Sequence, residues 1–186
     1  MLCAKTSLTE ITGVEIQKEV FEMAKRSIIL NNLENKFKII NSNVKDIDKI
    51  LECNYFDVVV SNPPYKKMQT GKVNENEKKL ISRHEVEACL DDFINISSKM
   101  LKSKGELYMV HRPDRLVDII EALRKYKLEP KEIKFVHPNK DKAPNMLLIK
   151  AVKNAKPFLK VMEPLYVYNI DGSYTEEILK IYNKNI

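Results

Sequence analysis

The chain of 186 residues is the size of one domain and is long enough to bury a substantial core. Its 44% hydrophobic and 31% charged residues are typical of a folded globular protein, and no apolar run approaches the roughly 20 residues that a membrane span needs. The net charge of +6 is compatible with a polyanionic partner but is a weak signal on its own. The N-terminus lacks the pattern of a signal peptide, so we expect a cytoplasmic protein.

The cysteines and histidines are few and scattered along the chain. Cys3, Cys53 and Cys89 are odd in number and form no CxxC pair, which argues against a disulfide framework and against a zinc site. The three histidines lie in unrelated segments. We therefore expect a protein without a bound metal.

The first third of the chain alternates patterns of strand and helix. Apolar spacing predicts strands over 9–16, 36–41 and 56–60, a helix over 17–31, and a short helix or turn over 46–51. A lysine-rich stretch follows over 66–81, too long and too hydrophilic for a tight connection. Long loops in compact domains are usually functional or mobile, and this one adjoins the end of the third strand.

The same alternation continues in the rest of the chain. The pattern predicts a helix from about Ser82 to Gly105, a strand over 106–110, and a helix that begins near Pro113. Strands over 132–137 and 146–152 are expected to pair antiparallel, followed by an extended segment over 158–168 and a closing helix over 175–183. The fold class is therefore α/β, a mostly parallel sheet covered on both faces with an antiparallel C-terminal hairpin.

An apolar strand ends abruptly at the tetrapeptide Asn62-Pro63-Pro64-Tyr65. Open α/β sheets bind ligands at the carboxyl ends of their strands. Asn62 offers a side-chain carbonyl, Pro63 has no N–H to donate to a strand ladder, and Tyr65 offers a flat face. Together they can grip a planar group that carries an amine. The alternative is a proline-rich turn that only ends a strand.

Polar side chains also follow the two earlier strands. Glu15 lies where an acidic residue of nucleotide-binding α/β folds accepts hydrogen bonds from a ribose. Its alternative role is a carboxylate that interacts with the dipole of the next helix. Asn43 is in reach of an adenine edge by the same argument, but an asparagine after a strand is more often a turn former, and we favour that interpretation.

The tetrapeptide behind an apolar strand resembles the motif of class I S-adenosylmethionine-dependent amino-methyltransferases, which act on adenine, cytosine or glutamine amide nitrogens. More of the chain is similar to the bacterial adenine-N(6)-methyltransferases that modify valine tRNA beside the anticodon. The similar stretches are 13–17, 23–27, 83–85, 110–116 and 135–138. The resemblance implies a Rossmann-like methyltransferase sheet, S-adenosyl-L-methionine as cofactor, and methyl transfer to the exocyclic amine of an adenine in tRNA.

The resemblance also implies roles for individual residues. The Asn62 side chain and the Pro63 carbonyl accept hydrogen bonds from the target amine, and Tyr65 stacks on the flipped base, with Pro64 completing the motif. Two acceptors outside the ring plane favour a pyramidal, more nucleophilic nitrogen in line with the sulfonium methyl. The cofactor-binding residues implied are Glu15, Ile16, Asn43, Val44 and Asn62.

Basic residues surround the expected mouth of this site. Lys66, Lys67 and Arg83 are candidates for contacts with RNA phosphates, and His84 and Arg112 are further candidates for substrate contact. The resemblance implies tRNA as the partner, and we expect a monomer or weak homodimer. A solvated loop and structural roles are the alternatives. A second cluster that can extend the track, or be a solvated helix end, consists of Arg124, Lys125, Lys127, Lys131, Lys134, Lys140 and Lys142.

The chain departs from the family in one respect. Its four glycines never form the glycine-rich turn that wraps the methionyl part of the cofactor, and 1–7 resembles the end of the helix after that turn. We therefore expect residues 1–186 to be a single methyltransferase domain that lacks its first strand and is truncated at the N-terminus. Two other functions stay open: an amino-methyltransferase acting on DNA or a protein glutamine, and a non-catalytic RNA-binding remnant.

Overall fold

The computed structural model describes residues 10–65 and 88–182 and divides the chain into two compact units. Of the described residues, 10–51 and 88 belong to the first unit, and 52–65 and 89–182 belong to the second. Each unit is considered by itself. The single domain expected from the sequence stays a prediction.

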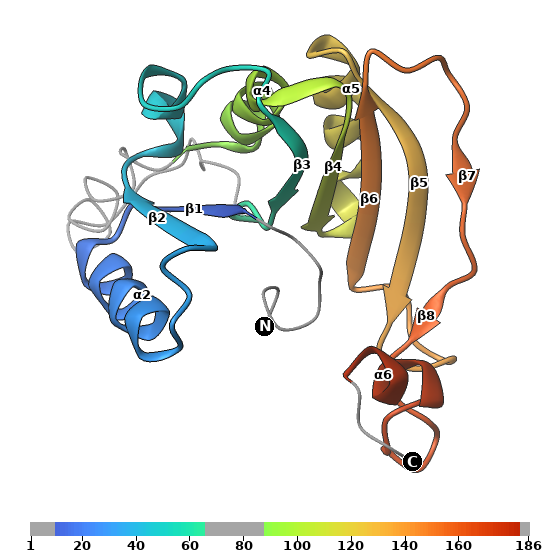
Figure 1. The fold of residues 1–186 in the computed structure, drawn as a ribbon. Coiled ribbons are helices and arrows are strands. Elements are labelled where there is room, and N and C mark those ends of the chain that lie inside the picture. The colour runs from blue at the N-terminus through green and yellow to red at the C-terminus, as the bar shows by residue number, and fades with distance from the viewer. Residues whose placement is uncertain (1–9, 66–87, 183–186) are drawn as a thin grey trace, which may run out of the picture. The chain divides into compact units, whose positions relative to one another are not determined.

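The first unit contains the strand, helix and strand expected at the start of the chain (Figure 1). Strand β1 (Ile11–Glu15) pairs parallel with β2 (Phe37–Asn41), and α2 (Lys18–Leu30) connects them. The short helix that follows, η1 (Val44–Lys49), begins two residues before the predicted start at 46. It begins there because the Asn43 side chain accepts the Lys45 N–H and caps it.

The second unit is built on a mixed sheet with the order β3-β4-β6-β5-β7 (Figure 1). Its strands are β3 (Phe56–Ser61), β4 (Leu101–His111), β5 (Leu128–His137), β6 (Met146–Lys153), β7 (Lys160–Val161) and β8 (Leu165–Tyr166), the last pairing with β5. Strand β6 runs antiparallel to both of its neighbours, while the β3–β4, β5–β7 and β5–β8 pairs are parallel. The mostly parallel sheet with an antiparallel hairpin is therefore confirmed.

Two helices pack on one face of this sheet and enclose the main core. They are α4 (Leu90–Met100) and α5 (Leu116–Lys125), with the short η2 (Pro113–Arg115) leading into α5. The core cluster joins both helices to alternate residues of β4 and β6; it contains Leu90, Ile94, Leu107, Met109, Ile119, Leu123, Leu147 and Ile149. Among residues 10–65 and 88–182, no helix is long and apolar enough to cross a lipid bilayer.

The opposite face of the sheet is covered only in part by the described elements of this unit. Val58, Val60 and Tyr108 point to that face and are exposed. At its far end, α6 (Glu176–Ile181) packs through Ile178 against Val136 of β5. We expected helices on both faces of the sheet. In the part of this unit that the structure describes, helices cover one face completely and the other only in part.

The helix expected to reach Gly105 ends at Met100, so that prediction is wrong at its C-terminal end. Leu101 has extended backbone and a fully buried side chain, and it opens β4 instead. Between Leu101 and Glu106 the strand bulges, and β3 covers the same distance with only Phe56 to Val58. The start of the expected helix falls within 66–87, outside the described residues.

Strand β5 is longer than predicted because a bulge accommodates Pro130. The strand begins at Leu128 rather than at Glu132, and its register with β6 shifts between Pro130 and Glu132. A proline lacks the N–H that a strand ladder needs, which is why the sequence pattern appeared to start only after it.

Candidate functional site

Three segments converge at the carboxyl edge of the sheet in the second unit. Strands β3 and β4 are parallel neighbours with Ser61 paired to Met109, so Asn62 and His111 both lie at this edge. Because β6 is antiparallel to β4, its first residue, Met146, starts from the same edge. The turn before β6 therefore lies at the same edge of the sheet as the carboxyl end of β3, which the tetrapeptide follows.

The tetrapeptide has a defined geometry. The Tyr65 hydroxyl donates a hydrogen bond of 2.7 Å to Asn62 Oδ1, and Pro63 between them is fully buried. Asn62 is exposed, and 37% of Tyr65 remains accessible. The buried proline anchors the segment while the amide and the aromatic ring stay open to a ligand. A carbonyl oxygen has two lone pairs, so Asn62 Oδ1 can accept a second hydrogen bond.

His111 is fully buried and contacts Tyr65. Its ring contacts the Tyr65 ring in a T-shaped arrangement, with the centroids 5.1 Å apart and the planes at 68°. The Arg112 N–H donates to His111 Nδ1 over 2.8 Å. Burial lowers the pKa of His111, and the positive charge of Arg115 lowers it further, so the imidazole is neutral near pH 7.

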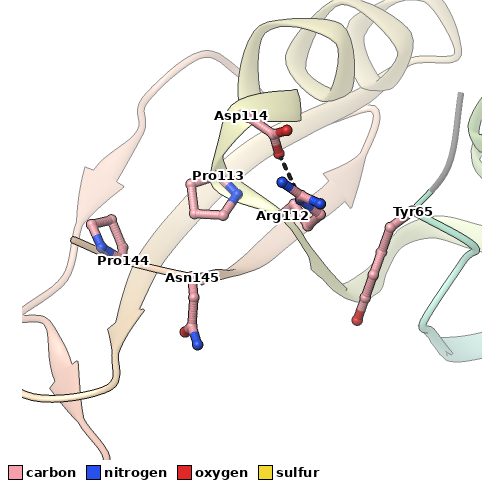
Figure 2. A pocket seen from close by; sticks show the side chains of 6 residues that line it. All are labelled: Tyr65, Arg112, Pro113, Asp114, Pro144 and Asn145. Carbon is pink, nitrogen blue, oxygen red and sulfur yellow. Dashed lines mark hydrogen bonds and ion pairs between the residues drawn. The ribbon is translucent and has the colours of Figure 1, made fainter. Parts of the chain in front are cut away.

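A hollow of about 470 Å³ opens beside the exposed part of Tyr65 (Figure 2). It is lined by Tyr65, Arg112, Pro113, Asp114, Pro144 and Asn145. Arg112 Nε is 3.2 Å from Asp114 Oδ1, which holds the guanidinium at the rim. Two proline rings and a phenol supply apolar walls, while an amide and an ion pair supply polar groups. Such a lining suits a flat heterocycle with polar edges.

Four of the five predicted cofactor residues, Glu15, Ile16, Asn43 and Val44, lie at the carboxyl edge of β1 and β2 in the first unit, while Asn62 lies in the second unit. Glu15 Oε1 accepts the Gln17 N–H at 2.7 Å, which is the helix-start role named as its alternative. Asn43 caps η1, the turn-forming role that we favoured. Asn41, which sequence reasoning did not single out, donates to the Glu15 and Ile16 carbonyls and ties the two strand ends together. Val44 follows as the first residue of η1.

Of the predicted RNA-binding residues, Arg112 is the one that the structure describes. Lys66, Lys67, Arg83 and His84 lie outside the described residues. Their roles stay predictions from the sequence.

Members of the second basic cluster lie at both edges of the sheet, while Lys131 and Lys134 lie within β5. Helix α5 leads from the carboxyl end of β4 to the start of β5, so Arg124 and Lys125 at its end lie at the opposite edge from Tyr65. Both are paired there, Arg124 with Glu129 and Lys125 with Asp91. Lys140 and Lys142 lie in the turn between β5 and β6, at the edge of the candidate site, and are exposed.

Sequence reasoning missed Pro144 and Asn145 as site residues. The available signal was the predicted antiparallel pairing of the last two long strands, which brings the turn between them to the ligand-binding edge. Within the described ranges, no three His, Cys, Asp or Glu side chains are grouped so that they could hold a metal ion.

The protein is a Rossmann-like methyltransferase. Its sheet has the antiparallel strand β6 inserted between β4 and β5, and β3 is followed by Asn-Pro-Pro-Tyr. Solved structures share this fold. A predicted O-methyltransferase from Agrobacterium tumefaciens superposes with a TM-score of 0.73 at 23% identity, covering 94% of this chain and 77% of its own. A geranyl diphosphate C-methyltransferase from Streptomyces coelicolor, solved with S-adenosyl-L-homocysteine, superposes with a TM-score of 0.58 at 11% identity. The match covers 78% of this chain and 63% of that one.

The chain belongs to the Eco57I restriction-modification methylase family, whose profile matches residues 9–143. It is therefore an S-adenosylmethionine-dependent methyltransferase by family and fold. Among curated relatives, the tRNA1(Val) (adenine(37)-N6)-methyltransferase of Cytophaga hutchinsonii is 22% identical, over 97% of this chain and 74% of its own length. The enzyme of the same name from Parabacteroides distasonis is 25% identical, over 84% of this chain and 66% of its own length.

Proposed function

We propose that the chain transfers the methyl group of S-adenosylmethionine to the exocyclic amine of an adenine in tRNA. The observation that carries this proposal is the exposed Asn62 amide beside an exposed Tyr65 ring at the carboxyl end of β3. The activity for which the curated relatives are named agrees with it, and their names specify adenine 37 of a valine tRNA. A tRNA substrate also favours a cytoplasmic location.

The proposed chemistry depends on positioning the amine rather than on an acid or a base. The lone pair of an aromatic amine is delocalised into the ring, which makes the nitrogen a poor nucleophile. Asn62 Oδ1 and the Pro63 carbonyl accept its two hydrogens and favour the pyramidal, nucleophilic form. Tyr65 stacks on the extruded base, and the hollow beside it receives the ring.

The cofactor is proposed to use the polar edge of the first unit. Glu15 Oε2 accepts no hydrogen bond from the residues described, so this oxygen fits a ribose hydroxyl while Oε1 holds the helix start. Ile16 is 41% exposed and can contact the cofactor with its apolar side chain. We assign Val44 and Asn43 to the same edge of the first unit. Asn62, in the second unit, stays a cofactor-binding prediction from the sequence. The bound cofactor supplies the electrophilic methyl group.

The tRNA backbone is proposed to follow the basic side chains at the carboxyl edge. Arg112, Lys140 and Lys142 are exposed there. Lys66, Lys67, Arg83 and His84 are proposed as further RNA contacts from the sequence alone. Each lysine or arginine that neutralises a phosphate releases a counterion, so affinity will fall with rising salt. Arg124 and Lys125 are excluded from this track because they lie at the opposite edge.

A DNA adenine is the second candidate substrate, because the matching family is named for restriction-modification methylases. Incubation of the chain with tritiated S-adenosylmethionine and, in turn, tRNA, duplex DNA and a protein fraction separates the candidates. We expect label in tRNA. Label in DNA or protein instead would overturn the substrate assignment.

The role of the tetrapeptide is tested with Asn62→Ala. Transfer should be abolished, while the affinity for S-adenosylhomocysteine, measured by calorimetric titration, should stay nearly unchanged. Asn35→Ala is the matched control, because Asn35 is an exposed asparagine in the turn between α2 and β2. Turnover of Asn62→Ala at the rate of the control would contradict the proposal. A wild-type chain that binds RNA but no S-adenosylhomocysteine would instead be a non-catalytic remnant.

A further inference from the structure

His111 is a buried imidazole whose protonation state is fixed by its contacts. Its Nδ1 accepts a hydrogen bond from the Arg112 backbone N–H, and an amide N–H can only donate. The single proton of the neutral ring must therefore sit on Nε2. That atom is buried and has no hydrogen-bond partner in the part of the chain that the structure describes.

The charges that face His111 from the adjoining elements keep it neutral. Arg115 of η2 has a side chain only 15% exposed, and together with Arg112 it opposes a positive charge on the ring. Asp114 is the carboxylate that acts in the opposite direction, but it is mostly exposed and paired with Arg112. Burial is the largest cause of the lowered pKa of His111, and the two arginines add to it. A charged His111 is thus disfavoured near pH 7.

The Tyr65 ring is held at two points. Its hydroxyl donates to Asn62 Oδ1 at 2.7 Å, and its ring meets His111 at a centroid distance of 5.1 Å in a T-shaped contact. A hydroxyl contact alone lets the ring rotate about the axis through its oxygen. The second contact, from a side chain that is itself immobilised in the core at the end of β4, defines the plane of the ring.

We propose that His111 is a positioning residue that fixes the plane of the Tyr65 ring, and so the plane in which the target base stacks. The inference rests on the proposed function for the stacking of a base on Tyr65. His111 does not touch the substrate. It acts through Tyr65, because its buried ring contacts the tyrosine ring but does not line the hollow.

Two substitutions separate the ring contact from the backbone contact of His111. His111→Asn retains an acceptor near the position of Nδ1 for the Arg112 N–H but removes the ring. His111→Phe retains a flat ring against Tyr65 but removes the acceptor. If His111 acts through Tyr65, His111→Asn should lose at least about 10-fold in kcat with KM changed less than about threefold, and His111→Phe should stay within about threefold of wild type.

A spectroscopic measurement without RNA tests the same contact. The chain is labelled with 3-fluorotyrosine and observed by ¹⁹F nuclear magnetic resonance. The ¹⁹F resonance of Tyr65 is assigned as the one that disappears in Tyr65→Phe. The resonance should shift in His111→Asn and stay near its wild-type position in His111→Phe. In wild-type protein labelled with ¹⁵N and free of fluorotyrosine, a nuclear Overhauser effect should join the two rings, and long-range ¹H–¹⁵N correlations should place the His111 proton on Nε2.

The reverse order of the variants, with His111→Phe impaired and His111→Asn active, would overturn the proposal and assign His111 to the Arg112 backbone alone. Two fully active variants would overturn it as well. If both variants fail to fold, the wild-type measurement decides, and the absence of a nuclear Overhauser effect between the rings refutes the contact. A wild-type chain that methylates no tRNA but shows this contact would disprove the proposed function and leave the positioning contact intact.

Discussion

The Tyr65 hydroxyl donates to Asn62 Oδ1 at 2.7 Å, so the aromatic end of the tetrapeptide fixes the orientation of the amide at its start. The two side chains that serve the target base in the proposed reaction are thereby coupled before a substrate arrives. Since Pro63 between them is buried, the coupled pair is carried by the core of the second unit. Preorganisation of this kind lowers the cost of orienting the amine.

Tyr65→Phe keeps the stacking ring and removes the donor to Asn62. Because a typical hydrogen bond contributes about 0.5–1.5 kcal/mol, we expect transfer to tRNA to fall about 2- to 10-fold. Tyr65→Ala also removes stacking, worth about 1–3 kcal/mol per base, and should lose a further 5- to 150-fold. Single-turnover methylation rates measure both effects. Tyr168→Phe, at a tyrosine stacked on Tyr174, is the control; equal losses in Tyr168→Phe and Tyr65→Phe would refute the coupling.

Lys153→Met should destabilise the second unit. Lys153 Nζ donates to the carbonyls of Ser98 and Leu101 at the end of α4 and to Asn54 Oδ1, so its removal leaves these acceptors without their donor. We expect a loss of about 1–3 kcal/mol in the free energy of unfolding, measured by urea denaturation. Lys102→Met, which breaks an exposed ion pair with Asp57, should change stability little. Equal effects in the two variants would contradict this account of Lys153.

Gly105→Ala should also destabilise the second unit, for a steric reason. A Cβ atom at position 105 would lie 2.9 Å from the Lys102 carbonyl oxygen and 3.2 Å from that of Asp57, and neither backbone atom can move freely. The expected cost is about 1–3 kcal/mol, read from the shift of the thermal unfolding midpoint. Ser103→Ala, at an exposed position in the same bulge, is the control. A Gly105→Ala protein as stable as the control would show that the bulge relaxes without cost.

The stability of the protein should fall as the pH is lowered through the titration of His111. Burial, and then Arg115, lower the pKa of His111 below its ordinary value of about 6.5. Between the lowered and the ordinary pKa the unfolded chain binds a proton that the folded chain does not, so unfolding is favoured there. The contribution is fully present above the ordinary pKa and is lost as the pH falls toward the lowered one.

The measurement is the free energy of unfolding from pH 8 to pH 5 for the wild type and for His111→Phe. Because other groups titrate alike in both proteins, the difference between the two curves isolates His111. It should be flat above about pH 7 and should shift in favour of the variant below about pH 6. A constant difference over the whole range would show that His111 does not couple folding to pH.

The sequence determined the elements whose signals are local. The apolar runs of β1, β2 and β3, the antiparallel hairpin of β5 and β6, and the closing helix α6 lie where their patterns predicted them. The tetrapeptide could be recognised in the same way, because its two prolines and its amide follow one another along the chain. The predicted C-terminal end of α4 was wrong because Leu101 continues the apolar spacing of the helix, although it is the first residue of β4.

Only the tertiary structure decided which side chains act together with the tetrapeptide. His111 is distant from Tyr65 in sequence, and the parallel pairing of β3 with β4 brings the two rings into contact. The antiparallel direction of β6 brings Pro144 and Asn145 to the same edge, and the crossover through α5 takes Arg124 and Lys125 away from it. Residue types and local periodicity contain no information about such long-range pairing, because strand order and direction are set by how the whole core packs.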